Sequence, residues 1–140
     1  MTTLDFTLRL SAALFAGLAI GLERQWHHKS TGLKTNMLVA TGAAIYVLLS
    51  FILKVKEPTI DITRIIAQVV TGVGFLGAGV IFREGVNVHG LNSAATIWCS
   101  AALGCIAASG LYLETLICTI LILLINLFLQ PLEKWLENRN

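Results

Sequence analysis

Residues Val69–Phe82 have the sequence VVTGVGFLGAGVIF, an apolar run with four glycines that ends at a charged pair, Arg83-Glu84. Glycine disfavours a helix in water because the unfolded chain has more backbone freedom to lose. In a bilayer, however, small residues let two helices approach closely and pack well. If the run is a helix, its glycines lie on two faces, with Gly74 and Gly77 on one and Gly72 and Gly79 on the other. The run therefore predicts a central transmembrane helix that packs on more than one side.

A dinucleotide-binding loop is the competing interpretation, because Gly72, Gly74 and Gly77 match the pattern G-x-G-x-x-G. Such a loop follows a strand, opens a helix and is followed by an acidic residue about 20 positions later. Here both flanks are apolar, and the segment Ser93–Thr96 contains no acid. We therefore favour the membrane helix and predict no cofactor.

The composition also indicates a membrane protein. Of the 140 residues, 56% are hydrophobic and 13% are charged, whereas soluble domains average about 25% charged residues. The net charge of +2 comes from dispersed basic residues, which argues against a nucleic-acid-binding surface. The three cysteines all lie within apolar runs. Their odd number and their setting argue against a disulfide framework and favour a packing role.

Five segments are long and apolar enough to cross a bilayer core about 30 Å thick, which requires about 20 residues of helix. They cover about residues 4–22, 35–53, 64–82, 92–109 and 111–129. The first is not expected to be a signal peptide, because no basic segment precedes it and no good cleavage site follows. The sequence thus predicts an all-α fold, a polytopic membrane bundle of five transmembrane helices. We expect a single domain with no soluble C-terminal domain.

Basic residues set the expected orientation of the bundle. Arg24, Lys29 and Lys34 lie close to the first two spans on one side, and positive charge near the spans favours the cytoplasmic side. An odd number of spans places the two termini on opposite sides. We therefore expect the N-terminus outside and the C-terminus in the cytoplasm.

Small residues also predict which helices are central. Ala13, Gly17 and Gly21 recur at four-residue spacing in the first span and form a stripe suited to close helix crossing. The fifth span has bulky residues on every face and should be peripheral. We expect the first, third and fourth spans to form the core. The remaining small-residue surface favours a homo-oligomer, with a dimer as the commonest closed assembly.

Polar residues within or beside the spans are functional candidates, because charge in a bilayer is costly and usually faces protein or water. The candidates are Arg9, Glu23, Arg24, Asn36, Arg64, Gln68, Arg83, Glu84 and Asn92. Arg9 has two open interpretations, an ion pair with Asp5 one turn earlier or a functional role. Glu23-Arg24 and Arg83-Glu84 end two spans on the same side. We expect the four residues to form one interfacial charge cluster on the cytoplasmic side of the dimer, and the alternative is that they line a polar vestibule.

Amides near the span ends have expected structural roles. Asn36 and Asn92 begin the second and fourth spans, where each could cap its helix or bond a neighbouring helix. Asn126, near the end of the fifth span, is expected to bond a neighbouring helix or subunit.

Catalytic and metal-binding patterns are missing from the sequence. The histidines lie in short loops, and no carboxylate cage at ligand spacing accompanies them as a Mg²⁺ site would require. No nucleophile is paired with a base. We predict neither a metal site nor an enzymatic activity.

Four strings of sequence are distinctive. They are IGLERQW at Ile20–Trp26, GLKTN at Gly32–Asn36, a segment from Arg64 to Gly79 that begins RIIAQ and ends GFLGAG, and GLNSAATIW at Gly90–Trp98. In this order, and over nearly the whole chain, they resemble the MgtC/SapB family of bacterial inner-membrane proteins. Longer members carry a cytoplasmic C-terminal domain with an ACT-like fold, which this chain is expected to lack. Lys34 stands where many members have arginine, which keeps the charge but loses a planar, bidentate donor.

The resemblance implies a role in growth under magnesium limitation and, in pathogens, in survival inside host cells. It also implies a modulator of other membrane systems, with the proton-translocating ATP synthase as a proposed partner. We therefore interpret the chain as a non-catalytic inner-membrane protein that acts on another membrane complex. The alternative is an ion channel or transporter for Mg²⁺, protons or anions, and it requires an oligomer because five short helices can hardly enclose a selective pore.

Overall fold

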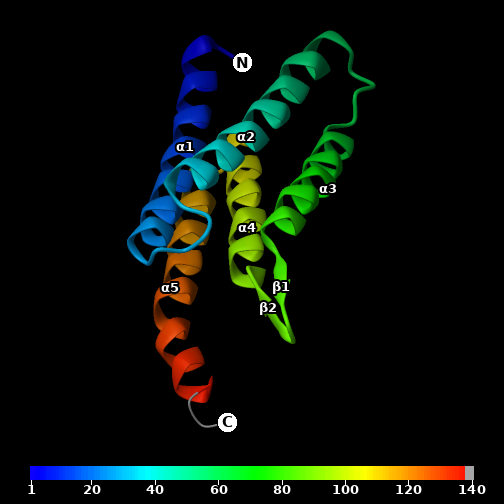
Figure 1. The fold of residues 1–140 in the computed structure, drawn as a ribbon. Helices are drawn as coiled ribbons and strands as arrows, with labels where there is room; N and C mark the ends of the chain where they lie inside the picture. The colour runs from blue at the N-terminus through cyan, green and yellow to red at the C-terminus, as the bar shows by residue number, and fades with distance from the viewer. Residues whose placement is uncertain (138–140) are drawn as a thin grey trace.

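The computed structural model describes residues 1–137, with the side chains of residues 1–129. The elements in chain order are α1 (Thr3–Trp26), α2 (Leu33–Lys56), α3 (Ile62–Val80), β1 (Phe82–Glu84), β2 (Asn87–His89), α4 (Leu91–Ala108) and α5 (Tyr112–Glu137) (Figure 1). Each of the five helices is long and apolar enough to cross a membrane. The predicted all-α membrane fold with five spans is therefore confirmed.

The helix boundaries follow local sequence signals. The Thr2 hydroxyl accepts a hydrogen bond from the first turn of α1, and Asp61 caps α3 by accepting from Thr63. The hydroxyl and the backbone N–H of Thr63 both donate to Asp61 and lower the pKa of its carboxyl. A tight turn joins α4 to α5. It contains Gly110 with a φ of 79°, which glycine adopts without steric cost.

A short β-hairpin links α3 to α4, where the sequence predicts only a loop. The strands are antiparallel with Glu84 opposite Asn87, so Gly85 and Val86 form a two-residue turn. Gly85 has a φ of 61°, a left-handed conformation that the first turn position of such hairpins favours. As a result α3 ends at Val80, before the end of the predicted span.

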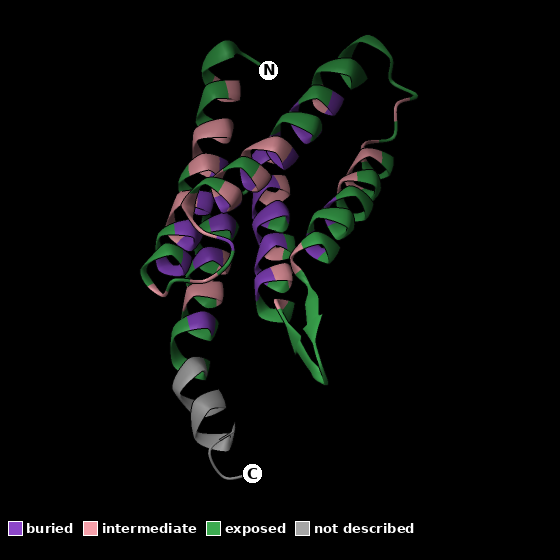
Figure 2. Cartoon of the chain, in the orientation of Figure 1, coloured by how far each residue is buried: buried purple, intermediate pink, exposed green. Residues whose placement is uncertain are grey.

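The core of the bundle is formed by α1, α2 and α4, on which most of the buried residues lie (Figure 2). These helices meet at Ala40 of α2. A Cβ built on Gly17 of α1 would lie 2.9 Å from the Ala40 Cβ, and one built on Gly104 of α4 would collide with the Ala40 carbonyl oxygen. Both close approaches therefore require glycine. The prediction that the third span belongs to this core is wrong, because α2 occupies that place.

One side of α3 packs against the bundle. Val73 and Gly77 are its buried residues, and a Cβ on Gly77 would contact Ala94 of α4 at 3.6 Å. Three other glycines would have no neighbour within 4 Å of an added Cβ: Gly72, Gly74 and Gly79. The expectation that α3 is central and packs on more than one side within this chain is therefore wrong.

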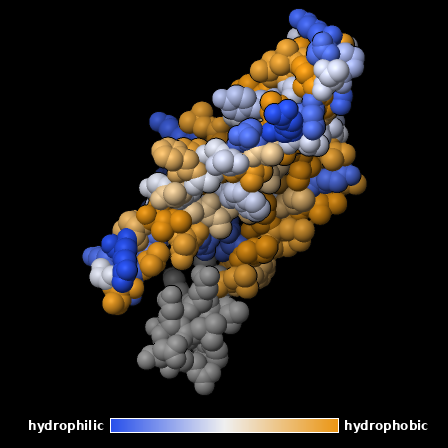
Figure 3. Space-filling view, turned by 90° about the vertical axis from the view of Figure 1, so that its right-hand side faces the viewer, coloured by the Kyte–Doolittle hydropathy of each residue, from blue (hydrophilic) through white to orange (hydrophobic). Residues whose placement is uncertain are grey.

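The outer surface is suited to lipid. Between residues 112 and 129 most side chains of α5 are exposed, which confirms that the fifth span is peripheral. Large apolar side chains are also exposed elsewhere, among them Phe15, Leu38, Phe75 and Trp98. Figure 3 shows hydrophobic residues over much of one face. Soluble monomers seldom expose apolar patches larger than about 300–600 Å², so this surface fits a bilayer.

Candidate functional site

Buried polar side chains gather at one end of the bundle, where α1 ends and where α2 and α4 begin. Gly21 allows this meeting, because a Cβ at this position would lie 2.8 Å from the Cα of Leu33 in the first turn of α2. The connection between the two helices turns back at His28, which has a φ of 51°. The backbone N–H of Lys29 then donates to the Arg24 carbonyl oxygen in the last turn of α1 at 3.0 Å.

Arg24 is the largest polar side chain that this end encloses. It is fully buried, and its Nη2 donates to Ser93 Oγ on α4 at 3.0 Å. Ser30 Oγ donates to the same hydroxyl at 3.0 Å. Among the described residues, four buried side-chain atoms at this end have no hydrogen-bond partner: Glu23 Oε1, Arg24 Nε, Arg24 Nη1 and Thr31 Oγ1. The site therefore holds both unused donors and an unused carboxylate oxygen.

Glu23 faces a different helix from its neighbour. Its Oε2 accepts from Asn126 Nδ2 on α5 at 3.1 Å, which confirms that Asn126 bonds a neighbouring helix. Its Oε1 lies 3.2 Å from Nδ1 of His27, one turn later on α1. That nitrogen is also 2.9 Å from the Glu23 carbonyl oxygen. The His27 ring therefore contacts both the backbone and the carboxylate of Glu23 at the end of α1.

Asn36 forms the next polar layer toward the middle of the bundle. Its Nδ2 donates to the Gly32 carbonyl oxygen at 2.9 Å, and its Oδ1 accepts from Ser100 Oγ on α4 at 2.8 Å. Asn36 thus bonds a neighbouring helix, one of its two expected roles. Asn92 is exposed, and α4 has Gly90 as its N-cap, so the expectation that Asn92 caps that helix is wrong.

Arg9 lies at the opposite end of the bundle. Its Nε donates to Asp5 Oδ1 at 2.9 Å, and its Nη1 donates to the Ala108 carbonyl oxygen at 3.0 Å in the last turn of α4. The guanidinium also lies 5.9 Å from the ring centroid of Phe51 on α2. The predicted Asp5–Arg9 pair is therefore present, and Arg9 additionally joins three helices and stabilises a helix C-terminus.

The predicted charge cluster does not form within this chain. Arg83 and Glu84 lie in the exposed hairpin, where Arg83 Nε donates to the Gly85 carbonyl oxygen. Glu23 and Arg24 are buried between helices, so the two pairs do not share an environment. The cause is the hairpin itself, which carries Arg83 and Glu84 beyond the end of α3. Arg64 is also exposed.

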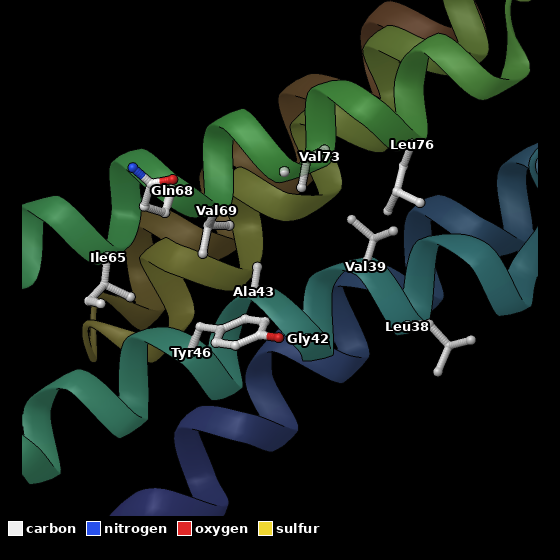
Figure 4. A pocket seen from close by; sticks show the side chains of 11 residues that line it. Leu38, Val39, Gly42, Ala43, Tyr46, Ile65, Gln68, Val69, Val73 and Leu76 are labelled. Carbon is white, nitrogen blue, oxygen red and sulfur yellow. The ribbon is translucent and has the colours of Figure 1, made fainter.

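An apolar groove with a volume of about 560 Å³ separates α2 from α3 (Figure 4). Val39 and Ala43 line it from α2, and Val69 lines it from α3. Its polar groups are the Tyr46 hydroxyl and the exposed Gln68 amide. Gln68 therefore lies at the groove and shares no contact with the residues of the Arg24 site. The lining suits apolar groups rather than ions.

Four hydroxyl residues of the site were not among the sequence candidates: Ser30, Thr31, Ser93 and Ser100. A signal for two of them exists in the sequence. Ser93, Thr96 and Ser100 recur at spacings of three and four in an otherwise apolar helix, which places them on one face. In the structure all three are buried. In the described part of the chain, no three His, Cys, Asp or Glu side chains are grouped so that they could hold a metal ion.

Five membrane-length helices around a small buried polar cluster define a polytopic helical membrane protein. The chain belongs to the MgtC family, whose sequence profile matches residues 10–135. This confirms the family that the four sequence strings predict.

Named relatives support the assignment. The protein MgtC of Salmonella typhimurium (strain LT2) is 49% identical over 130 residues, which are 93% of this chain and 54% of that protein. The protein MgtC of Brucella abortus (strain 2308) is 48% identical over 128 residues, 91% of this chain and 52% of that protein. The chain therefore spans about half the length of the curated relatives that it matches. No solved structure matches it.

Proposed function

We propose that this protein is a non-catalytic bacterial inner-membrane protein that supports growth under magnesium limitation by modulating another membrane complex. Membership of the MgtC family and five membrane-length helices support this proposal. The proton-translocating ATP synthase is our candidate partner. In the proposed orientation the N-terminus lies outside and the C-terminus lies in the cytoplasm.

The observation that carries the proposal is an unused small-residue face on α3. Four exposed residues at spacings of four, three and four define this α3 stripe: Ala67, Thr71, Gly74 and Ala78. An added Cβ at Gly74 would have no neighbour within 4 Å. In lipid, small residues at such spacing let another helix approach closely. The stripe points away from both the α2–α3 groove and α4, so a transmembrane helix of the partner complex can reach it.

A leucine on the α3 stripe tests the proposal. We expect Gly74→Leu to abolish support of growth in low-magnesium medium at an unchanged protein level. Overpacking a close helix contact costs about 1–3 kcal/mol, a loss of about 5- to 150-fold in association. Gly79→Leu is the matched control, because Gly79 is equally uncovered but lies off the stripe. Equal growth of the two variants would contradict the proposal, and cross-linking from the stripe would distinguish a foreign partner from a second copy.

A flux assay tests the alternative of an oligomeric channel or transporter. Purified protein in liposomes should carry no Mg²⁺, proton or anion flux above that of empty liposomes. Flux that depends on the protein would overturn the proposal and support the channel.

A further inference from the structure

The groove between α2 and α3 has room for another helix. Its walls include Gly42 on α2 and Gly72 on α3, and a Cβ added at either glycine would have no neighbour within 4 Å. Leu38 and Leu76 are exposed along its edges (Figure 4). In a bilayer, small residues in a wall let a second helix approach closely. The groove can therefore accept a helix, but its apolar lining alone does not identify which one.

A polar side chain in the groove narrows the choice. Gln68 is exposed on the α3 wall, about 9 Å along the helix axis from the start of α3 at Ile62. Its amide forms no hydrogen bond with any described residue, and neither does the exposed Tyr46 hydroxyl on the α2 wall. In the apolar part of a bilayer an amide without a partner is costly. The occupant of the groove must therefore offer a donor and an acceptor at the depth of Gln68.

A second copy of the chain meets this requirement. Copies inserted in the same orientation can be related by a two-fold axis along the membrane normal, and two-fold dimers are the commonest closed assembly. Such an axis places Gln68 of both copies at the same depth, where each amide can donate to the other and accept from it. A lipid tail offers neither donor nor acceptor, and a foreign helix would need a polar residue at that same depth.

We propose that the α2–α3 groove is the interface of a parallel homodimer, in which α3 of each copy lies in the groove of the other. The α3 residues that line the groove recur at spacings of three and four, which places them on one side of the helix: Ile65, Gln68, Gly72 and Leu76. In coiled coils, one polar residue within such a face specifies the register and the number of helices. This face lies on a different side of α3 from the α3 stripe, so a second copy and a partner helix can bind together.

The first test measures association of the purified full chain in liposomes, by energy transfer between two populations labelled at the N-terminus, at decreasing protein-to-lipid ratio. Gln68→Leu removes the paired amides, so the dissociation constant of the dimer should rise about tenfold or more. Thr71→Leu is the matched control, because Thr71 is also exposed on α3 but its hydroxyl donates to the Ala67 carbonyl oxygen of its own helix. It should leave the dissociation constant unchanged.

The second test locates the interface by disulfide cross-linking in native membranes. Gly72→Cys should form a disulfide between two copies under mild oxidation, because Cα atoms closer than about 7 Å can be bridged. Gly74→Cys, on the α3 stripe, should not. A Cβ collides with nothing at either position, so both variants should fold. The wild-type protein, oxidised in parallel, accounts for the three natural cysteines.

The inference is overturned if the wild-type chain stays monomeric, if Gln68→Leu and Thr71→Leu weaken association equally, or if Gly74→Cys cross-links in preference to Gly72→Cys. Lipid retained by a monomer in mass spectrometry would likewise overturn it and assign the groove to a lipid tail. Cross-linking of Gly72→Cys to a different protein would overturn it in favour of a foreign helix. The liposomes contain no partner complex, so the dimer and the proposed regulatory function can fail independently.

Discussion

Glu23 and Arg24 are adjacent in the chain, yet each is held by a different helix. Glu23 accepts from Asn126 on α5, and Arg24 donates to Ser93 on α4. Successive residues on a helix point about 100° apart, so adjacent residues in one turn of α1 can contact two different helices. Both side chains are buried. The consequence is that either bond, once lost, leaves a charge inside the protein without its donor or acceptor.

Removing the amide of Asn126 tests this dependence. Asn126→Leu should lower the free energy of unfolding by about 1–3 kcal/mol, because the Glu23 carboxylate loses its hydrogen-bond donor while staying buried. Glu23→Gln combined with Asn126→Leu should cost less than the sum of the two single changes. Denaturation in mixed micelles measures all three variants against the wild type. Strict additivity would contradict a direct Glu23–Asn126 coupling.

The sequence predicted the charged members of the site but not its hydroxyl members. Arg24 is conspicuous because a charge beside an apolar run needs an explanation. Serine and threonine are not conspicuous in this way, because in a transmembrane helix their hydroxyls can hydrogen-bond to the backbone of their own helix. Thr115 and Thr119 do so, whereas Ser93 and Ser100 bond other helices. The choice depends on helix rotation and depth, which local sequence does not specify.

At the scale of whole helices, the place of α2 was the main feature that the sequence did not predict. Glycine content indicates that a helix can be approached closely, but it does not identify the neighbour. The glycines that matter for the core belong to α1 and α4, and both contact Ala40 on α2. The glycine-rich α3 keeps most of its small residues at the surface. Its composition is therefore consistent with contacts made outside this chain.

Alanine at two glycines should separate these roles. Gly17→Ala should destabilise the fold by about 1–3 kcal/mol, because the new Cβ would lie 2.7 Å from the Asn36 carbonyl oxygen. Gly72→Ala should be neutral or stabilise by up to about 1 kcal/mol, because alanine favours helix and nothing crowds it there. Unfolding in mixed micelles measures both. Equal destabilisation would contradict the assignment of α2 to the core and of α3 to the periphery.

At the scale of the molecule, the two ends of the bundle differ in chemistry. The α1–α2 connection and the β-hairpin lie at one end and the α2–α3 connection at the other (Figure 1). The first end encloses Arg24 and its hydroxyl partners, whereas at the other end Arg9 closes α4. The Arg24 site and the basic first loop therefore share one membrane surface. Which surface that is decides whether the site meets the cytoplasm.

Thiol labelling of single introduced cysteines tests this orientation. Thr59 in the α2–α3 connection and Val86 at the tip of the hairpin are both exposed. A membrane-impermeant thiol reagent should label Thr59→Cys in intact cells, and should label Val86→Cys only after permeabilisation, because the basic residues of the first loop favour the cytoplasm. The wild-type protein is the control, since Cys99, Cys105 and Cys118 are free but partly buried. The reverse labelling pattern would invert the topology and would place the Arg24 site at the outer surface of the membrane.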